Sequence, residues 1–189
     1  LERRRRPHSI SASPTLVKVN IRSRQCKNCD EECVVTKLIL GTGSYLPERR
    51  IDNDTLEKIV DDYERERAGS SLHDWAMKRA GIAARHIVAP GQGGAAMAAS
   101  AARAARDDAQ VGPDEIDLLV LSTFTGDYCI PSTVSLVQAE LGVTAKCFQL
   151  EAACAGFIDA TIVAAALIDT GKYARALVVH TEVMSSIVD

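Results

Sequence analysis

Residues 146–181 read KCFQLEAACAGFIDATIVAAALIDTGKYARALVVHT, and this segment is the strongest indication of the fold class. Lys146–Leu150 has the length and composition of a buried strand, and Ala176–Thr181 predicts a second one. Between them an apolar stretch from about Ala155 to Thr170 predicts a helix. A strand, a helix and a strand in this order are typical of a crossover between parallel strands. The segment therefore predicts an α/β fold with a mainly parallel, three-layer α-β-α core.

The chain from Thr36 onward continues this alternation of strands and helices. Asp54 and Glu57 form a capping-box pattern ahead of an amphipathic helix. Ser71 and Gly81 are suited to begin and end a second, shorter helix. Further strands are expected at 37–40 and 116–122, and further helices at 93–110 and from Pro131 to about Leu141. No internal repeat and no second series of strands and helices is visible.

Cys154 stands between the predicted strand Lys146–Leu150 and the predicted helix that begins near Ala155. A cysteine at a helix N-terminus faces unpaired backbone N–H groups and the positive end of the helix dipole, which favour its thiolate form. Small neighbours from Ala152 to Gly156 leave space for a substrate to reach the sulfur. The pattern predicts a reactive nucleophile, and the competing interpretation is a buried structural cysteine.

Composition separates the first 35 residues from the rest. The chain of 189 residues has a net charge of −3, yet residues 1–25 hold seven Lys or Arg and one acid. We expect residues 1–35 to be a basic, disordered extension, either a transit peptide or upstream translated sequence, and 36–189 to form the folded domain. A nucleic-acid role for the Arg-rich run is less expected than a solvated tail. No apolar run approaches the roughly 18 residues of a membrane span, so no membrane association is expected.

The six cysteines do not indicate a disulfide framework in a chain of this length. We therefore expect reduced thiols and a cytoplasmic location, or an organelle stroma if the extension is a transit peptide. Cys26, Cys29 and Cys33 have the close spacing of metal ligands, but no fourth Cys or His lies nearby. The sequence accordingly predicts no metal site.

The chain resembles the β-ketoacyl-acyl-carrier-protein synthase III family of condensing enzymes from near Lys37 to its last residue. Five segments carry the resemblance in the family's order: Ile39–Pro47, Trp75 through Gly81-Ile82 to Arg85-His86, Thr125–Ser132, Ala152–Phe157, and Gly171–Tyr173 with Ala176–Val179. The resemblance implies the thiolase fold, which has two similar halves, and this chain matches the first half. It also implies that a His and an Asn of the second half act on the malonyl thioester.

Several residue roles follow from the resemblance alone. Cys154 would be the nucleophile, Trp75 would stack on the adenine of coenzyme A, and Arg79 would meet a phosphate. Ser71 would be a further coenzyme A contact, and Ile130 would shape the end of the acyl pocket of a partner subunit in a homodimer. The competing interpretation of Trp75 is a core or interface anchor. His180 stands where the family has a small residue, and we interpret it as structural or supporting rather than catalytic.

The predicted function is transfer of an acyl group from acyl-CoA to Cys154, followed by decarboxylative condensation with malonyl-acyl-carrier protein. Acyl-CoA is thus a substrate, and no permanently bound cofactor is expected. Glu151 and an insertion at 62–69 keep open a same-fold acyltransferase with another acceptor. The end of the sequence at Asp189 keeps open a half-enzyme or non-catalytic subunit that needs a partner chain. Residues 36–189 alone are expected to expose a large apolar face and to aggregate.

Overall fold

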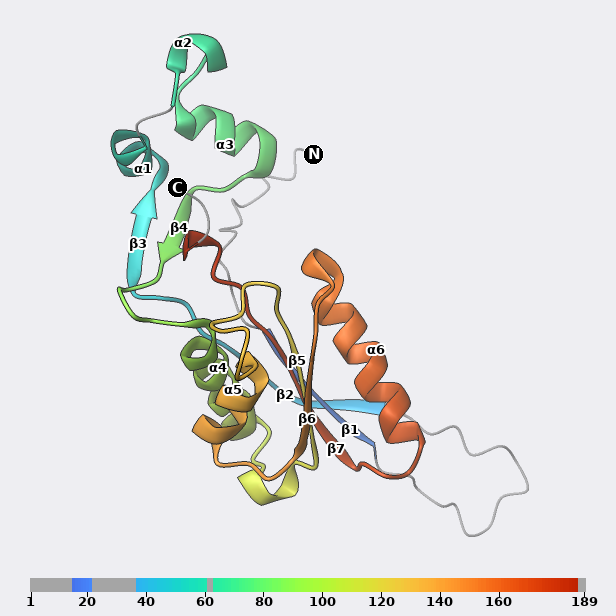
Figure 1. Ribbon diagram of the computed structural model, residues 1–189. Coiled ribbons are helices and arrows are strands. Elements are labelled where there is room, and N and C mark those ends of the chain that lie inside the picture. The colour runs from blue at the N-terminus through green and yellow to red at the C-terminus, as the bar shows by residue number, and fades with distance from the viewer. Residues whose placement is uncertain (1–14, 22–36, 61–62, 187–189) are drawn as a thin grey trace, which may run out of the picture. The chain divides into compact units, whose positions relative to one another are not determined.

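The computed structural model describes residues 15–21, 37–60 and 63–186, and it divides into two compact units (Figure 1). Among these residues, the sheet unit contains 15–21, 37–45 and 92–183, and the small unit contains 46–60, 63–91 and 184–186. Cys154 belongs to the sheet unit, whereas Trp75 and Arg79 belong to the small unit.

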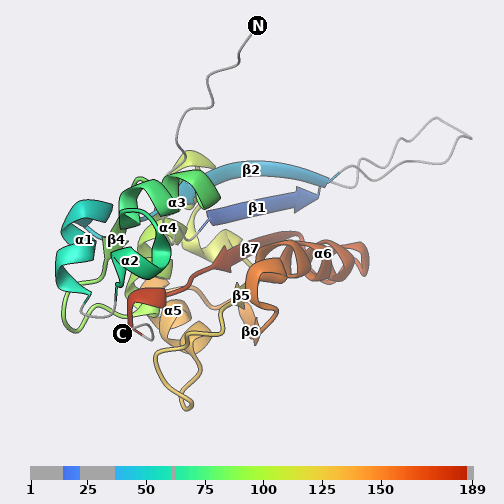
Figure 2. The ribbon, with the colours of Figure 1, turned by 90° about the horizontal axis from the view of Figure 1, so that it is seen from above.

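The sheet unit is built on five strands in the order β2-β1-β7-β5-β6. Their bounds are β1 Thr15–Ile21, β2 Lys37–Ser44, β5 Leu118–Ser122, β6 Lys146–Leu150 and β7 Arg175–His180. β5 is parallel to both β6 and β7, while β1 is antiparallel to both β2 and β7. Four of the five strands therefore share one direction, and Figure 2 shows β1 and β2 side by side at one edge. This confirms the mainly parallel sheet.

Helices cover both faces of this sheet, which confirms the three-layer architecture (Figure 1). α4 (Gly94–Asp108) and α5 (Thr133–Leu141) lie on one face, and α6 (Gly156–Asp169) lies on the other. Each interface has its own apolar core, because alternate residues of the central strands point to opposite faces. Leu119 and Leu121 pack toward α4 and α5, whereas Leu118 and Val120 pack toward α6.

The backbones of β2 and α4 approach each other so closely that β2 needs glycine. A Cβ atom at Gly41 would lie 2.7 Å from the carbonyl oxygen of Ala105, and one at Gly43 would overlap the carbonyl oxygen of Ala101. Real Cβ atoms do not come this near to backbone, so both positions exclude any side chain. The alanines on the facing side of α4 are completely buried, which accounts for the alanine-rich composition of this helix.

The small unit combines a two-stranded antiparallel sheet with three short helices. Its elements are β3 Arg49–Asp52, α1 Asn53–Ile59, α2 Arg65–Ala68, α3 Leu72–Ala80 and β4 Ala84–Ile87. Asn53 is fully buried and links these elements. Its amide nitrogen donates to the Ile82 carbonyl at 2.7 Å, and its amide oxygen accepts from Arg85 at 2.6 Å. Because both ends of the amide are paired, its burial is compatible with a stable unit.

Two predictions about local structure are wrong. β1 lies inside the segment 1–35 that was predicted to be a disordered extension, since its backbone pairs with β2 and β7 despite the basic composition around it. The rest of that segment lies outside the described residues. At α1 the N-cap is Asp52, whose carboxylate accepts from Thr55 N–H at 2.7 Å, so the cap stands two residues before the predicted Asp54. The predicted cap of α3 is confirmed, because Ser71 accepts from Asp74 N–H at 3.0 Å.

Candidate active site

Cys154 lies on a tight turn between the end of β6 and the start of α6. A single turn of 3-10 helix, Ala153–Ala155, joins the two elements, and the cysteine is exposed with a free thiol. The placement at a strand-to-helix turn is as predicted, whereas the competing interpretation of a buried structural cysteine is wrong. Two other free cysteines are described, the exposed Cys129 and the half-buried Cys147.

The residue before Cys154 has a strained backbone. Ala153 has a φ of 43°, in the left-handed region that residues other than glycine seldom occupy. Such strain costs on the order of 1–3 kcal/mol and collects at functional sites. The strained residue lies in the turn after β6 in which Cys154 is exposed. No local pattern indicates this strain, because alanine has no preference for that conformation.

The two backbone hydrogen bonds of this turn do not involve the N–H of Cys154. The turn begins with Ala155 N–H, which donates to the Ala152 carbonyl at 3.0 Å, and continues with Gly156 N–H, which donates to the Ala153 carbonyl. Cys154 precedes both of these donor residues in the chain. A backbone N–H beside the sulfur can receive the negative oxygen that forms when a thiolate attacks a thioester.

Glu182 folds the loop that follows β5, and no feature of its sequence context marks it as important. Its carboxylate accepts from the N–H of Phe124 and the N–H of Thr125, each at 3.1 Å, and from the Thr125 hydroxyl at 2.6 Å. Further along the same loop, Asp127 accepts from the first two N–H groups of α4, at Gly94 and Ala95. These bonds join residues 32 to 58 positions apart, which local sequence patterns do not reveal.

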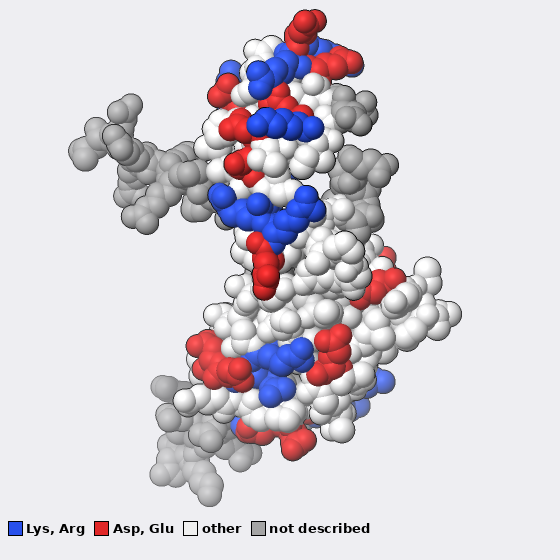
Figure 3. Space-filling view, turned by 90° about the vertical axis from the view of Figure 1, so that its left-hand side faces the viewer, with Lys and Arg blue, Asp and Glu red and all other residues white. Residues whose placement is uncertain are grey.

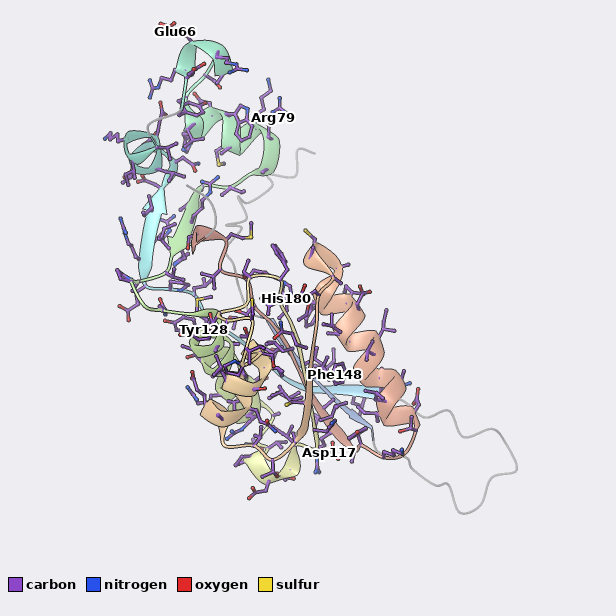
Figure 4. All side chains as sticks on the ribbon, in the orientation of Figure 1. Glu66, Arg79, Asp117, Tyr128, Phe148 and His180 are labelled. Atoms are coloured by element: carbon purple, nitrogen blue, oxygen red, sulfur yellow. The ribbon has the colours of Figure 1, made fainter. Side chains whose placement is uncertain are left out.

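This loop leads to Ile130, whose side chain is 90% exposed. The neighbouring Tyr128 is exposed as well, and Figure 4 labels it near α5. Glu151 is also exposed, so its carboxylate is not desolvated next to the thiol. An apolar side chain with the exposure of Ile130 is suited to an interface.

In the small unit, Trp75 and Arg79 lie one turn apart on α3. The guanidinium carbon of Arg79 is 5.4 Å from the centre of the Trp75 ring, and the tryptophan is 42% exposed. The predicted juxtaposition is present, and Trp75 is not a buried core residue. The Ser71 hydroxyl is already engaged, since it caps α3 and also donates to the Asp74 carboxylate at 2.9 Å.

The insertion predicted at 62–69 contains α2 and is anchored by Glu57. One carboxylate oxygen of Glu57 pairs with Arg65, and the other accepts from Leu72 N–H at 3.0 Å. The hydrogen bond from Arg65 is the main cause that lowers the pKa of Glu57, and the Leu72 N–H adds to it. Tyr63 donates to the Ser70 carbonyl at 3.0 Å and closes the same segment. Figure 3 shows Lys and Arg groups beside Asp and Glu groups on the face it presents.

The described ranges contain neither a metal-binding cluster nor a membrane span. No group of three or more His, Cys, Asp or Glu side chains in these ranges is arranged to hold a metal ion. Cys26, Cys29 and Cys33 lie outside the described residues. None of the described helices has the length and apolar character that crossing a bilayer requires.

Comparison with known proteins identifies the family. Residues 148–189 match the family model 3-Oxoacyl-[acyl-carrier-protein (ACP)] synthase III. Two curated relatives are β-ketoacyl-[acyl-carrier-protein] synthase III of Cereibacter sphaeroides, 41% identical over 82% of this chain and 46% of the relative, and that of Neisseria meningitidis, 42% identical over 80% and 45%. The chain thus spans about half the length of the curated relatives it matches.

Solved structures agree with the sequence comparison. The 3-oxoacyl-[acyl-carrier-protein] synthase III of Aquifex aeolicus superposes with a TM-score of 0.71 at 35% identity, covering 90% of this chain and 47% of that one. The priming β-ketosynthase of the R1128 polyketide pathway gives 0.70 at 37% identity, covering 79% and 42%. These matches bear out the half-thiolase architecture predicted from the sequence. The chain belongs to the β-ketoacyl-acyl-carrier-protein synthase III family of condensing enzymes.

Proposed function

We propose that this chain supplies the nucleophile-bearing half of a condensing enzyme that starts fatty-acid or polyketide chains. The observation that carries the proposal is the exposed Cys154 on a strained turn at the start of α6. Its family relatives are named as β-ketoacyl-acyl-carrier-protein synthase III. The second half, which those relatives have and this chain does not span, would supply the remaining catalytic groups.

The reaction has two stages. In the first, the Cys154 thiolate attacks the carbonyl carbon of acyl-CoA, a new C–S bond forms, and coenzyme A leaves as its thiolate. The Cys154 N–H would stabilise the oxyanion of the tetrahedral intermediate. In the second, malonyl-acyl-carrier protein loses CO₂, and the resulting carbanion attacks the acyl-cysteine. The β-ketoacyl product then leaves on the carrier protein, and the thiolate is restored.

Trp75 and Arg79 are the proposed coenzyme A contacts. The Trp75 ring is exposed enough to stack on a purine, and the Arg79 guanidinium is suited to a phosphate. Ser71 is assigned here as a weaker contact, because its hydroxyl already caps α3. We place the protein in the cytoplasm, or in an organelle stroma if residues 1–35 are a transit peptide.

Two exposed apolar surfaces support assembly with further protein. Ile158 and Ile162 are 58% and 60% exposed and lie four residues apart on α6, so they share one face of the helix. We propose that the second half of the complete enzyme covers this face. Ile130 would reach the acyl pocket of the partner subunit in a homodimer.

A second candidate is a condensation with a different acceptor in secondary metabolism. Among the similar solved structures are the priming β-ketosynthase of the R1128 pathway and AbyA1, a tetronic acid condensing enzyme that is 31% identical with a TM-score of 0.66. The insertion around α2 is a local feature that would suit a specialised substrate. Glu151 favours this candidate less than a buried carboxylate would, because its side chain is exposed. A half-enzyme subunit completed by a separate chain is the third candidate.

The test uses the complete enzyme, meaning this chain together with the second half that its relatives have. Radiolabelled acyl-CoA should leave one acyl group on Cys154, and Cys154→Ala should abolish labelling while Cys129→Ala retains it. Malonyl-acyl-carrier protein should then release CO₂ stoichiometrically with product. Labelling without CO₂ release would favour the second candidate, and no labelling of Cys154 would refute the nucleophile assignment. Trp75→Ala should raise the KM for acyl-CoA about tenfold or more with kcat preserved.

A further inference from the structure

Two buried polar atoms without partners lie at the strand ends near Cys154. They are Ser122 Oγ and His180 Nδ1, and neither has a hydrogen-bond partner within the described part of the chain. Buried polar atoms are nearly always paired, so each such exception requires an explanation. Ser122 is the last residue of β5 and is 1% exposed, and His180 is the last residue of β7. The two residues are register partners on adjacent parallel strands.

Both atoms face the first residue of α6, two positions after Cys154. A Cβ atom placed on Gly156 would overlap Ser122 Oγ and would lie 3.4 Å from His180 Nδ1. Figure 4 shows His180 at the end of the sheet at which α6 begins, with Asp117 at the opposite end. The ends of β5 and β7 therefore form the surface on which the turn that carries Cys154 packs. Gly156 can pack against this surface because it has no side chain.

The chemistry of the two side chains is complementary. A serine hydroxyl donates one hydrogen bond, and one ring nitrogen of a neutral imidazole accepts one. Since both atoms approach the same point beside Gly156, they are near neighbours, and rotation about χ1 of Ser122 moves its oxygen without moving the backbone. A bond between them would satisfy both buried atoms and fix the surface against which Gly156 packs.

We propose that Ser122 and His180 are a positioning pair for the nucleophile, in which the serine hydroxyl donates to His180 Nδ1 and the bonded pair holds the Cys154 turn in its reactive position. The inference rests on the proposed function, because it assigns the pair to the step at Cys154. His180 acts here through the backbone of Gly156 and does not touch the substrate. A sulfur displaced by a small distance from its place beside the backbone N–H groups loses reactivity steeply.

The experiment compares three variants of the complete enzyme: Ser122→Ala, His180→Leu and His180→Asn. The readout is the rate of iodoacetamide alkylation at Cys154, followed by peptide mass spectrometry. The half-buried Cys147 of the same molecule is the internal control, because unfolding would expose its thiol. Ser122→Ala and His180→Leu should each slow Cys154 alkylation about tenfold, since one hydrogen bond corresponds to about one factor of ten. Asparagine retains an acceptor near the Nδ1 position, so His180→Asn should stay within about threefold of wild type.

A second readout detects the bond itself. In protein labelled with ¹⁵N-histidine, Ser122→Ala should shift the Nδ1 resonance of His180, which His180→Asn identifies by its loss. An unchanged Nδ1 resonance, or wild-type alkylation of Cys154 in Ser122→Ala, would overturn the proposal. Faster alkylation of Cys147 in a variant would also count against it, because it indicates a general loss of structure.

Alkylation requires neither acyl-CoA nor carrier protein, which separates the two proposals. If the enzyme condenses normally but neither Ser122→Ala nor His180→Leu changes the alkylation rate, only the positioning pair is refuted. Sensitive alkylation in a protein that forms no acyl-enzyme would refute the proposed function alone. In an active enzyme, breaking the pair should lower the acylation rate constant and leave the KM for acyl-CoA unchanged.

Discussion

A methyl group added at Gly156 would measure how tightly α6 is seated on the strand ends. In Gly156→Ala the new carbon would overlap Ser122 Oγ and lie 3.2 Å from Ser122 Cβ. Overpacking of this kind costs about 1–3 kcal/mol, and alanine regains at most about 1 kcal/mol of helix propensity. We therefore expect the free energy of unfolding to fall by about 1–2 kcal/mol.

The same substitution made together with Ser122→Ala removes the overlapping oxygen and leaves the 3.2 Å contact with the Cβ of residue 122 and the 3.4 Å contact with His180 Nδ1. The double variant should recover most of the loss, which gives a coupling free energy of about 1–2 kcal/mol between the two sites. Urea unfolding of the complete enzyme at constant m-value provides the measurement. Gly112→Ala is the matched control, because its nearest neighbour would be Glu115 Oε2 at an ordinary 3.6 Å. Strictly additive free energies for the two substitutions would show that a side chain at position 156 does not press on Ser122.

Three further predictions concern other parts of the chain. The folded-state pKa of Glu57 is lowered by Arg65, so the stabilisation is complete above the ordinary value of 4.5 and is lost as the pH falls through the folded value. The hydrogen-exchange protection factors of the amides at 63–72, corrected for the slower intrinsic exchange in acid, should therefore fall on acidification, and Glu57→Gln should remove that dependence. Ala153→Gly should raise the free energy of unfolding by about 1 kcal/mol in thermal or urea unfolding, since glycine tolerates the φ of 43°; a loss of stability would contradict the assigned strain. Residues 1–189 alone, a chain that keeps β1, should elute as aggregates in light-scattering chromatography because Ile158 and Ile162 are uncovered; a monomer that unfolds cooperatively would contradict this.

Prediction from the sequence succeeded where local signals were strong. The strand Lys146–Leu150 has the predicted bounds, and α6 begins within one residue of the predicted position. Ser71 and Gly81 were recognised as helix ends because capping depends on residues only a few positions apart. The position of Cys154 follows from these same elements, so the amino-acid sequence alone is sufficient to locate the turn that carries it.

The features that were missed depend on distant contacts or on backbone conformation. The carboxylate of Glu182 binds a loop about 58 residues earlier in the chain, and no local pattern marks it. The convergence of Ser122 and His180 requires the register of β5 and β7, which a single sequence does not specify. β1 was hidden by composition, because an arginine-rich surrounding outweighed its alternating pattern. The strain at Ala153 is imposed by the elements on either side of it.

The contact of β2 with α4 restricts which substitutions this layer can accept. Gly41 and Gly43 contact the backbone of the helix, and backbone atoms cannot relieve a clash by changing rotamer as a side chain can. Spacing between these two elements is consequently fixed by main-chain atoms, and a larger residue could be accepted only if the whole helix moved away from the sheet. The smallest side chains in the unit thus stand at its least replaceable positions, and an engineer who wishes to diversify this family should leave that contact untouched while varying the α6 side of the sheet.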